Sequence, residues 1–339
     1  MSSQPSQEPL EPSVQSPRSA PPQRQPYAGM PLDLAAPWGG SSRTVDLGGP
    51  LHYVDFGGPE GCDEGDAPAP AVLVHGLGGS HLNWVGLAPR LARDRRVVAL
   101  DLAGFGLSPS MGRSTSVDHN AALLSRFIHR VLGRPVVLIG NSMGGMISLL
   151  LAERRPEQVV GLGLIDPSLP VPRQRQDPQV AATFALYAVP RVGEAVLTRY
   201  NARFSDRQRV LGTIALCFAD ASRADDELVR ASVELAAWRR TTPAPEADFL
   251  AAARSLLAVL RRPRRYDALI AGIDRPVLLV HGELDRLVPV SAARRTAALN
   301  PGWHTAYLGG AGHTPQLEVP ADVMAALGPW LETVIDQKV

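Results

Sequence analysis

The sequence contains few cysteines, no long apolar run and almost no net charge. Its two cysteines, Cys62 and Cys217, are too few for a disulfide framework and lack the spacing of metal ligands. Lys plus Arg total 34 and Asp plus Glu total 33, so no overall field favours nucleic acid or an anionic membrane as a partner. No apolar run approaches the ~20 residues that a membrane span needs, and the N-terminus lacks the basic flank and apolar core of a secretory signal. We expect a cytoplasmic protein without a membrane span.

The composition is that of a soluble globular protein. The 339 residues are 45% hydrophobic and 20% charged, and they allow one large domain with an insertion or two domains. Residues 1–40 are rich in Pro, Ser and Gln and have few large apolar side chains, so we expect a disordered tail. Residues 41–166 and 272–339 contain strand patterns, whereas residues 167–271 contain only helical ones. The sequence therefore predicts a core domain interrupted by a helical cap.

In the predicted core, short apolar runs alternate with helical segments. Strands that alternate with helices form a mostly parallel sheet covered on both faces, so the predicted fold class is α/β. Ligands of such sheets bind at the carboxyl ends of the strands. The predicted strands are residues 44–47, 51–56, 71–74, 96–100, 135–139, 159–166, 276–280 and 304–308.

The remaining periodic segments are predicted helices. Those of the cap are Gln179–Leu186, Val192–Tyr200, Ser205–Phe218, Asp225–Trp238 and Ala247–Leu260. A basic run, Arg261–Arg265, closes the cap, either as a solvated face or as a surface that holds an anionic substrate or carrier. Core helices are predicted at residues 83–92, 116–132, 291–299 and 323–335, with Ser291 as the N-cap of the third.

One stretch, Gly140-Asn141-Ser142-Met143-Gly144-Gly145, organises the rest of the chain. A buried strand precedes it and a helix follows it, so Ser142 lies at a sharp strand-to-helix turn. Small residues are needed at 140, 144 and 145, because side chains there would collide with the strand or the helix. The turn exposes the Ser142 hydroxyl at the sheet edge, beside the backbone N–H of Met143.

Three further loops follow predicted strands and carry polar residues. They are His75-Gly76-Leu77-Gly78-Gly79, His281-Gly282-Glu283-Leu284-Asp285, and the stretch from Gly312-His313-Thr314 to Pro320. With these loops, the sequence from about residue 44 to 335 resembles the serine hydrolases of the α/β-hydrolase fold, most weakly between 167 and 271. The order serine, acid, histidine along the chain is the order that this fold uses.

The resemblance implies a catalytic triad of Ser142, Asp285 and His313. It also implies an oxyanion hole made by the N–H groups of Met143 and Leu77, with Gly78 as the alternative to Leu77. Asp166 follows the preceding strand, from which some related enzymes supply the acid, and Glu283 is a weaker contender that is expected to face solvent. Because a neutral histidine is needed, activity is expected to rise as the pH passes roughly 6 to 7.

Other polar residues in these loops are interpreted as structural. His75 is expected to shape its loop, and neither Asp101 nor Ser108 is expected to be catalytic. His81 and Trp84 either line the pocket or anchor the next helix.

The predicted activity is that of a carboxylic ester hydrolase, which acts on a small-molecule ester or other acyl substrate without metal or organic cofactor. Relatives with aspartate at the sharp turn, the haloalkane dehalogenases and epoxide hydrolases, are excluded as first interpretations by Ser142. The turn is also similar to that of C–C bond hydrolases of ring-cleavage products, but those usually have Trp where this chain has Thr314. Acyltransferases, cofactor-free perhydrolases and non-catalytic ligand-binding members of the fold stay open.

Overall fold

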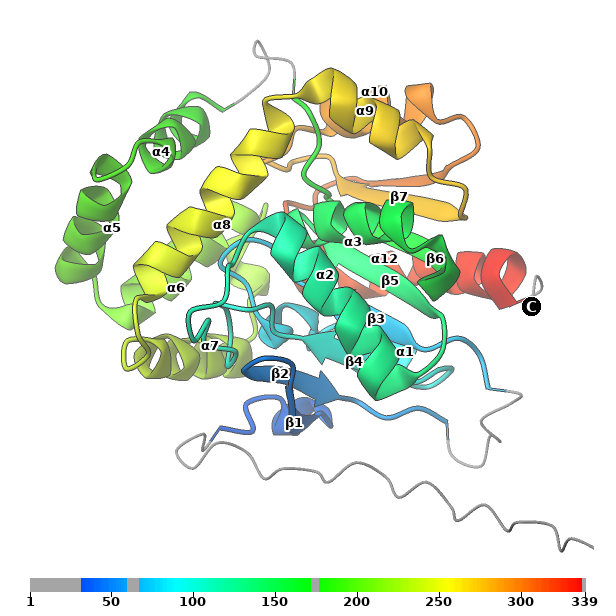
Figure 1. Ribbon diagram of the computed structural model, residues 1–339, viewed down its shortest axis with the longest axis horizontal. Coiled ribbons are helices and arrows are strands. Elements are labelled where there is room, and N and C mark those ends of the chain that lie inside the picture. Colours follow the sequence, from blue (N-terminus) through cyan, green and yellow to red (C-terminus); the bar gives the residue numbers. More distant parts are fainter. Residues whose placement is uncertain (1–31, 60–66, 172–176, 337–339) are drawn as a thin grey trace, which may run out of the picture.

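In the computed structural model, which describes residues 32–59, 67–171 and 177–336, the centre of the molecule is one twisted sheet (Figure 1). The described residues form eight strands in the order β1-β2-β4-β3-β5-β6-β7-β8. Only the β1–β2 and β2–β4 pairs are antiparallel, and every other neighbouring pair is parallel. The strands are β1 (Ser41–Asp46), β2 (Pro50–Asp55), β3 (Ala71–Val74), β4 (Val97–Leu100), β5 (Val136–Asn141), β6 (Val159–Ile165), β7 (Val277–Gly282) and β8 (His304–Leu308). The predicted α/β class is confirmed.

Helices cover both faces of the sheet. Alternate residues of the central strands belong to two separate apolar clusters, as expected when successive side chains point to opposite faces. On one face lie α2 (Val117–Phe127), α3 (Met143–Arg154), α9 (Pro263–Ala271) and α10 (Val290–Leu299). On the other lie α1 (Ala88–Leu91) and α12 (Pro320–Trp330). The short helix α11 (Pro315–Glu318) directly precedes α12.

The segment between β6 and β7 is helical, and we call its residues 178–271 the helical insertion. Besides α9, it contains α4 (Pro178–Ala188), α5 (Val192–Arg203), α6 (Asp206–Cys217), α7 (Asp226–Arg239) and α8 (Pro245–Leu260). In Figure 1, α4 and α5 lie at the outer edge, far from the sheet. Consistent with this place, α4 has no buried residue and α5 buries only Gly193.

The structure adds one helix at the arginine run and corrects one predicted N-cap. Arg262 is the N-cap of α9, the last helix of the insertion, and Tyr266 and Ile270 of this helix are buried in the apolar cluster beneath α2 and α3. The run itself is exposed, as the solvated-face interpretation requires. Ser291 is not an N-cap, since α10 begins at Val290 after Pro289.

The predicted disordered tail, residues 1–40, extends too far, because residues 32–40 are ordered against the core. Residues 1–31 lie outside the described residues, but residues 32–40 are packed. Leu34 and Ala35 are buried in a cluster with Val54 of β2 and Leu228 of α7. This short apolar pair packs beside the antiparallel strands of the sheet. The composition of residues 1–40 as a whole is Pro-rich, and it concealed these two buried side chains.

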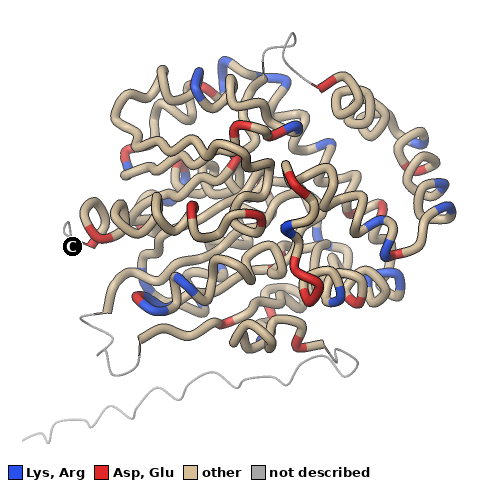
Figure 2. Tube along the Cα trace, turned by 180° about the vertical axis from the view of Figure 1, so that it is seen from behind, with Lys and Arg blue, Asp and Glu red and all other residues tan. Residues whose placement is uncertain are grey.

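Charges of both signs are interspersed over the surface seen in Figure 2, in keeping with the near-zero net charge. Within the described ranges, no single helix is long and apolar enough to cross a bilayer. Length and composition reach that level only for α4 and α5 taken together, and these two helices are bent by 116° relative to each other.

The turn from β5 to α3 depends on close approaches between backbones. A Cβ atom placed on Gly144 would lie 2.0 Å from the carbonyl oxygen of Val74, at the end of β3. On Gly140 it would lie 2.5 Å from Gly144 O, and on Gly145 it would lie 2.8 Å from Cβ of Pro167. The first turn of α3 therefore packs directly under the ends of β3 and β5, and side chains are excluded there.

We predict that Gly144→Ala lowers the free energy of unfolding by about 3 kcal/mol or more, because a backbone carbonyl cannot move aside as a flexible side chain can. The matched control is Gly328→Ala in α12, where a new Cβ meets nothing within 4 Å. That control should gain about 0.5–1 kcal/mol from helix propensity. Urea unfolding of both variants measures the difference, and equal midpoints would contradict the packing argument.

Candidate active site

Ser142 lies between β5 and α3 with a strained backbone. Its φ is 53° and its ψ is −118°, which is rare for a residue with a side chain. The strain is held by two backbone hydrogen bonds: Ser142 N donates to Ile165 O (3.1 Å), and Ser168 N donates to Ser142 O (3.0 Å). The Ser142 hydroxyl lies 3.4 Å from the hydroxyl of Ser168, whose own carbonyl accepts the buried Tyr266 hydroxyl. Strain of this kind typically marks functional sites.

Asp285 and His313 are hydrogen-bonded to each other. Nδ1 of His313 lies 2.7 Å from Oδ2 of Asp285, and Oδ1 of Asp285 accepts the N–H groups of Leu287 (2.7 Å) and Val288 (3.0 Å). Burial opposes ionisation of Asp285, but the nearby His313, with its charge and its hydrogen bond, lowers the pKa of this carboxyl below its usual value. An ionised carboxylate only accepts, so Nδ1 of His313 is the donor of this hydrogen bond, and in the neutral ring Nε2 is the nitrogen that can take up a proton.

The Ser142 turn and the His313 loop are joined through Asn141. The side-chain amide of Asn141 donates to His313 O and to Ile165 O, both at 3.0 Å. Among the described residues, no hydrogen bond joins the Ser142 hydroxyl to the His313 imidazole, because the hydroxyl faces Ser168 instead. The structure thus brings the two loops together at one edge of the sheet with the serine side chain turned toward its neighbour.

Asp166, the alternative acid, has a different environment. It is fully buried with φ 43°, and its Oδ1 accepts Gly282 N–H at 2.9 Å. Burial, and then the charge of Asp285, raise the pKa of Asp166 well above its usual value, which favours the protonated form of this carboxyl. It makes no hydrogen bond to His313, whereas Asp285 does. Glu283 is exposed and pairs with Arg294 at 2.6 Å.

Asp166, His281 and Asp285 offer ligand atoms within 4.8 Å of one another, a spacing that a metal ion could use. However, Nε2 of His281 lies 2.8 Å from Val288 O, to which it can only donate, and Oδ2 of Asp285 accepts from His313. Burial also lowers the pKa of His281, which keeps this ring neutral. Within the described part of the chain, Asp166 Oδ2 and His281 Nδ1 have no hydrogen-bond partner. The closely spaced atoms His281 Nε2 and Asp285 Oδ2 are already engaged in hydrogen bonds and are therefore not free as metal ligands.

Three backbone N–H groups in the two loops near Ser142 have no hydrogen-bond acceptor among the described residues. Gly76 packs against the serine, since a Cβ atom on it would lie 3.0 Å from Ser142 Cβ. The N–H groups of Leu77, Gly78 and Met143 donate to no other described residue. Met143 begins α3, whose N-terminal amides carry partial positive charge. The structure leaves the choice between Leu77 and Gly78 open.

Glu318 is a residue whose role sequence reasoning missed. Its side chain is fully buried, and its Oε2 accepts Gly312 N–H (2.8 Å), next to His313, and Ala219 N–H (3.1 Å). Its Oε1 accepts Asp220 N–H (2.9 Å) and Arg223 Nη1 (3.0 Å) from the helical insertion. Cys217 O also accepts His313 N–H at 2.6 Å. Glu318 therefore fastens the insertion to the loop that carries His313, and only its place in the histidine motif could have suggested it.

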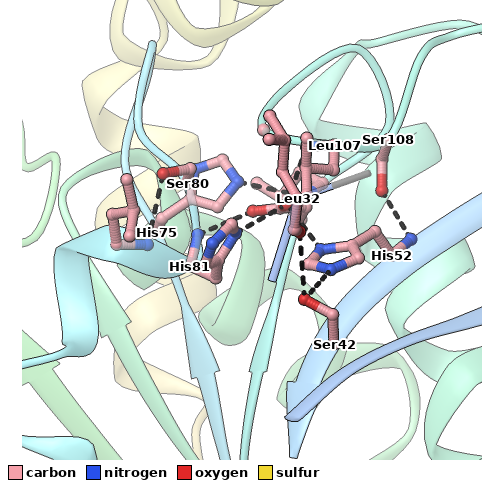
Figure 3. A network of polar contacts seen from close by, with 12 residues as sticks. Leu32, Ser42, His52, His75, Ser80, His81, Leu107 and Ser108 are labelled. Carbon is pink, nitrogen blue, oxygen red and sulfur yellow. Dashed lines mark hydrogen bonds and ion pairs between the residues drawn. The ribbon is translucent and has the colours of Figure 1, made fainter. Parts of the chain in front are cut away.

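The carboxylate of Asp101 is the centre of a separate buried network, part of which is shown in Figure 3. Its Oδ2 accepts Nδ1 of His52 (2.8 Å), Nδ1 of His81 (2.9 Å) and Leu107 N–H (2.7 Å), and its Oδ1 accepts His81 N–H (2.6 Å). Although the three groups are spaced closely enough for a metal, both imidazoles direct their Nδ1 atoms to the same carboxylate oxygen as donors. Burial opposes ionisation, but His81 and His52 outweigh it and hold the pKa of Asp101 well below its usual range. The network joins β2, the loop after β3 and the loop after β4.

The other loop residues have structural surroundings. His75 is buried, bonds Gly76 O through Nδ1 (2.7 Å) and accepts Leu102 N–H through Nε2 (3.0 Å). Burial lowers the pKa of His75 to about 4, so the ring is neutral. The hydroxyl of Ser108 accepts His52 N–H at 2.7 Å. His81 and Trp84 are fully buried, which favours their interpretation as anchors of the next helix.

Comparison with known proteins gives consistent matches. A family model described as alpha/beta hydrolase fold matches residues 70–320. The pimeloyl-[acyl-carrier protein] methyl ester esterase of Aeromonas salmonicida (strain A449) is 30% identical over 251 residues, covering 74% of this chain and 90% of that protein. The 2-hydroxymuconate semialdehyde hydrolase of Pseudomonas sp. (strain CF600) is 27% identical over 280 residues, covering 77% and 86%. Among solved structures, the haloalkane dehalogenase DbeA from Bradyrhizobium elkani USDA94 has the same fold, with TM-score 0.73, 24% identity and coverage of 88% of this chain and 100% of that chain.

The protonated state of Asp166 predicts a pH-dependent stability. In the unfolded chain this carboxyl titrates near about 4, and in the folded chain its pKa is raised. A raised carboxyl pKa means that stability is lost as the pH rises above about 4 toward the folded pKa. The variant Asp166→Asn keeps an acceptor for Gly282 N–H but has no proton to lose. We expect its free energy of unfolding, relative to the natural protein, to increase between pH 5 and pH 8 in urea titrations; a constant difference would contradict the assignment.

Proposed function

Since this chain belongs to the α/β-hydrolase family, we propose that it is a serine hydrolase that cleaves a carboxylic ester through an acyl-enzyme. The observation that carries the proposal is the hydrogen bond between ionised Asp285 and Nδ1 of His313, on the loop joined by Asn141 to the strained serine. Ser142 is the proposed nucleophile, His313 the general base and Asp285 the residue that orients it.

The reaction needs one side-chain movement. The Ser142 hydroxyl leaves Ser168 by rotation about its Cα–Cβ bond and turns toward Nε2 of His313, which takes its proton as the oxygen attacks the ester carbonyl. Asp285 stabilises the imidazolium that forms. The N–H groups of Met143 and Leu77 donate hydrogen bonds to the carbonyl oxygen as negative charge develops on it, and each such donor lowers the barrier by roughly 3 kcal/mol.

The second half of the reaction uses the same groups in reverse. His313 gives its proton to the leaving alcohol, which completes acylation, and then removes a proton from a water molecule that attacks the acyl carbonyl. As the bond to Ser142 Oγ breaks, His313 gives that proton to Oγ, so the acid is released and the hydroxyl is restored. We propose that the helical insertion acts as a cap that excludes bulk water from these steps. Its attachment to the His313 loop through Glu318 supports that role.

Hydrolysis of an activated C–C bond is the second candidate. It is favoured by the similarity of the Gly140–Gly145 turn to that class and by the relative from Pseudomonas sp., a 2-hydroxymuconate semialdehyde hydrolase. Sequence identity does not separate the two candidates, because the esterase of Aeromonas salmonicida and the 2-hydroxy-6-oxo-2,4-heptadienoate hydrolase of Pseudomonas putida are both 30% identical to this chain. The ester reaction is preferred because this chain has Thr314 after His313, where C–C bond hydrolases usually have Trp.

We predict that Ser142→Ala abolishes ester turnover, lowering kcat by roughly 10⁴–10⁶-fold without changing the unfolding midpoint. Turnover of p-nitrophenyl esters and labelling by a fluorophosphonate probe measure the loss. The matched control is Ser168→Ala, which removes the neighbouring hydroxyl and should still be labelled at residue 142. Both p-nitrophenyl esters and a ring-cleavage product are tested as substrates. Undiminished turnover in Ser142→Ala would contradict the assignment of Ser142 as the nucleophile.

The two buried aspartates should differ in their effects on catalysis. Asp285→Asn removes the acceptor that fixes the His313 tautomer and should lower kcat by roughly 10³–10⁴-fold. Asp166→Asn makes the same substitution at the end of the neighbouring strand β6, and its kcat should stay within a few-fold of that of the natural protein. Steady-state kinetics with one ester measures both values of kcat. A larger loss in Asp166→Asn than in Asp285→Asn would assign the role of the acid to Asp166.

A further inference from the structure

A cavity of about 300 Å³ lies between α4 and α6 of the helical insertion and the loop after β7. This volume is at the lower end of the range for small-molecule sites, about 300–1,000 Å³. Its lining is formed by Gln179, Val180, Thr183, Phe184, Gly212, Ala215, Leu216, Arg286 and Leu287. None of these residues belongs to the reacting groups of the proposed function, on which the following inference rests.

Two walls of the cavity are continuous with the loops of Asp285 and His313. Leu287 donates its N–H to Oδ1 of Asp285 at 2.7 Å, so this wall is fixed by the carboxylate that orients His313. Leu216, on the α6 wall, immediately precedes Cys217, whose carbonyl accepts His313 N–H at 2.6 Å. The cavity therefore adjoins the acid and the base of the site.

A row of aromatic rings joins the third wall to the loop that carries the free amides. The ring of Phe184, in the cavity lining, lies 6.1 Å from that of Tyr187, edge to face. Tyr187 in turn lies 5.6 Å from Phe249 of α8, also edge to face. A Cβ atom on Gly78 would lie 3.2 Å from the Phe249 ring, which places the end of the row against the loop after β3. The row of rings therefore lies between the cavity and the loop that carries the Leu77 and Gly78 amides.

The lining is of mixed polarity: Gln179, Thr183 and Arg286 are polar, whereas Val180, Phe184, Leu216 and Leu287 are apolar. The guanidinium of Arg286 is half-exposed, and its nearest carboxylate is Asp177, at 3.3 Å from Nη2 and 3.4 Å from Nε. Such long, exposed pairs contribute little, so a ligand carboxylate can replace Asp177 as the partner. A cavity with an apolar wall and one accessible guanidinium matches an amphiphilic chain better than a wholly apolar one.

We propose that this cavity binds the acyl chain of an ester whose far end carries a carboxylate, and that Arg286 pairs with that carboxylate. The substrate class is then the half-esters of dicarboxylic acids and esters with an equivalent terminal anion. Phe184, Leu216 and Leu287 contact the methylene chain, and the length of the chain decides whether its carboxylate reaches Arg286.

The experiment compares monomethyl with dimethyl esters of the same dicarboxylic acids, over a series of chain lengths, by kcat/KM. The natural protein should prefer the monomethyl ester at one chain length. In Arg286→Gln that preference should fall by about threefold to tenfold, with turnover of the dimethyl ester within twofold. In Asp177→Asn it should increase, because the competing carboxylate is gone. The matched control is Arg294→Gln, another exposed arginine paired with a carboxylate, which should leave the preference unchanged.

A second variant tests occupancy of the cavity without touching a charge. Val180→Trp on α4 fills the space far from Asp285 and His313 and should reduce turnover of long acyl chains while leaving acetate esters unaffected. Equal losses on both esters in Arg286→Gln, or none on either, would overturn the inference while leaving the esterase proposal intact. Absence of turnover of either ester by the natural protein, with no fluorophosphonate labelling, would instead overturn the proposed function and this inference with it.

Discussion

The close approach of α3 to the end of β3 is the constraint on which the site depends. With Gly144 under the Val74 carbonyl, the chain has no room for a gentler turn after β5, and Ser142 is forced to φ 53°. The same packing directs the Met143 amide to the sheet edge and sets Gly76 against the serine. The core thus holds the strained backbone of Ser142, and Asp166, at the end of the neighbouring strand β6, also has a positive φ (43°).

Four buried carboxylates around this edge differ because their hydrogen-bond donors differ. Asp101 and Glu318 each accept several N–H groups, which fix backbone segments relative to one another. Asp285 accepts two amides and one imidazole, and is kept ionised. Asp166 accepts one amide beside the charge of Asp285 and takes up a proton. Neighbouring acids are thereby separated in pKa, an arrangement common where acid–base chemistry occurs.

Local patterns predicted most of this molecule, because they depend on residues close in sequence. The helix predicted at Ser205–Phe218 is found as α6 (Asp206–Cys217) with Ser205 as its N-cap. The glycine spacing around Ser142 and the loop motifs likewise pointed to the candidate residues Asp285 and His313, which the structure joins by a hydrogen bond. What the sequence did not reveal depends on long-range contacts. The arginines of α9 concealed that helix, the Pro-rich residues before position 32 concealed the packed segment 32–40, and Glu318 was missed because its four donors come from segments about 6 and 100 positions away. Cavities are hidden for the same reason.

The helical insertion has one firmly held side and one loosely held side. Residues 217–223 are bound to the His313 loop by a fully buried carboxylate and by a backbone hydrogen bond, so movement there would disturb His313 itself. On the other side, α4 buries no residue and α5 buries only Gly193. Elements with few buried contacts open at the lowest free energy. Because α4 also forms one wall of the cavity, that wall belongs to the less buried side of the insertion, whereas the opposite side is fixed to the loop of His313.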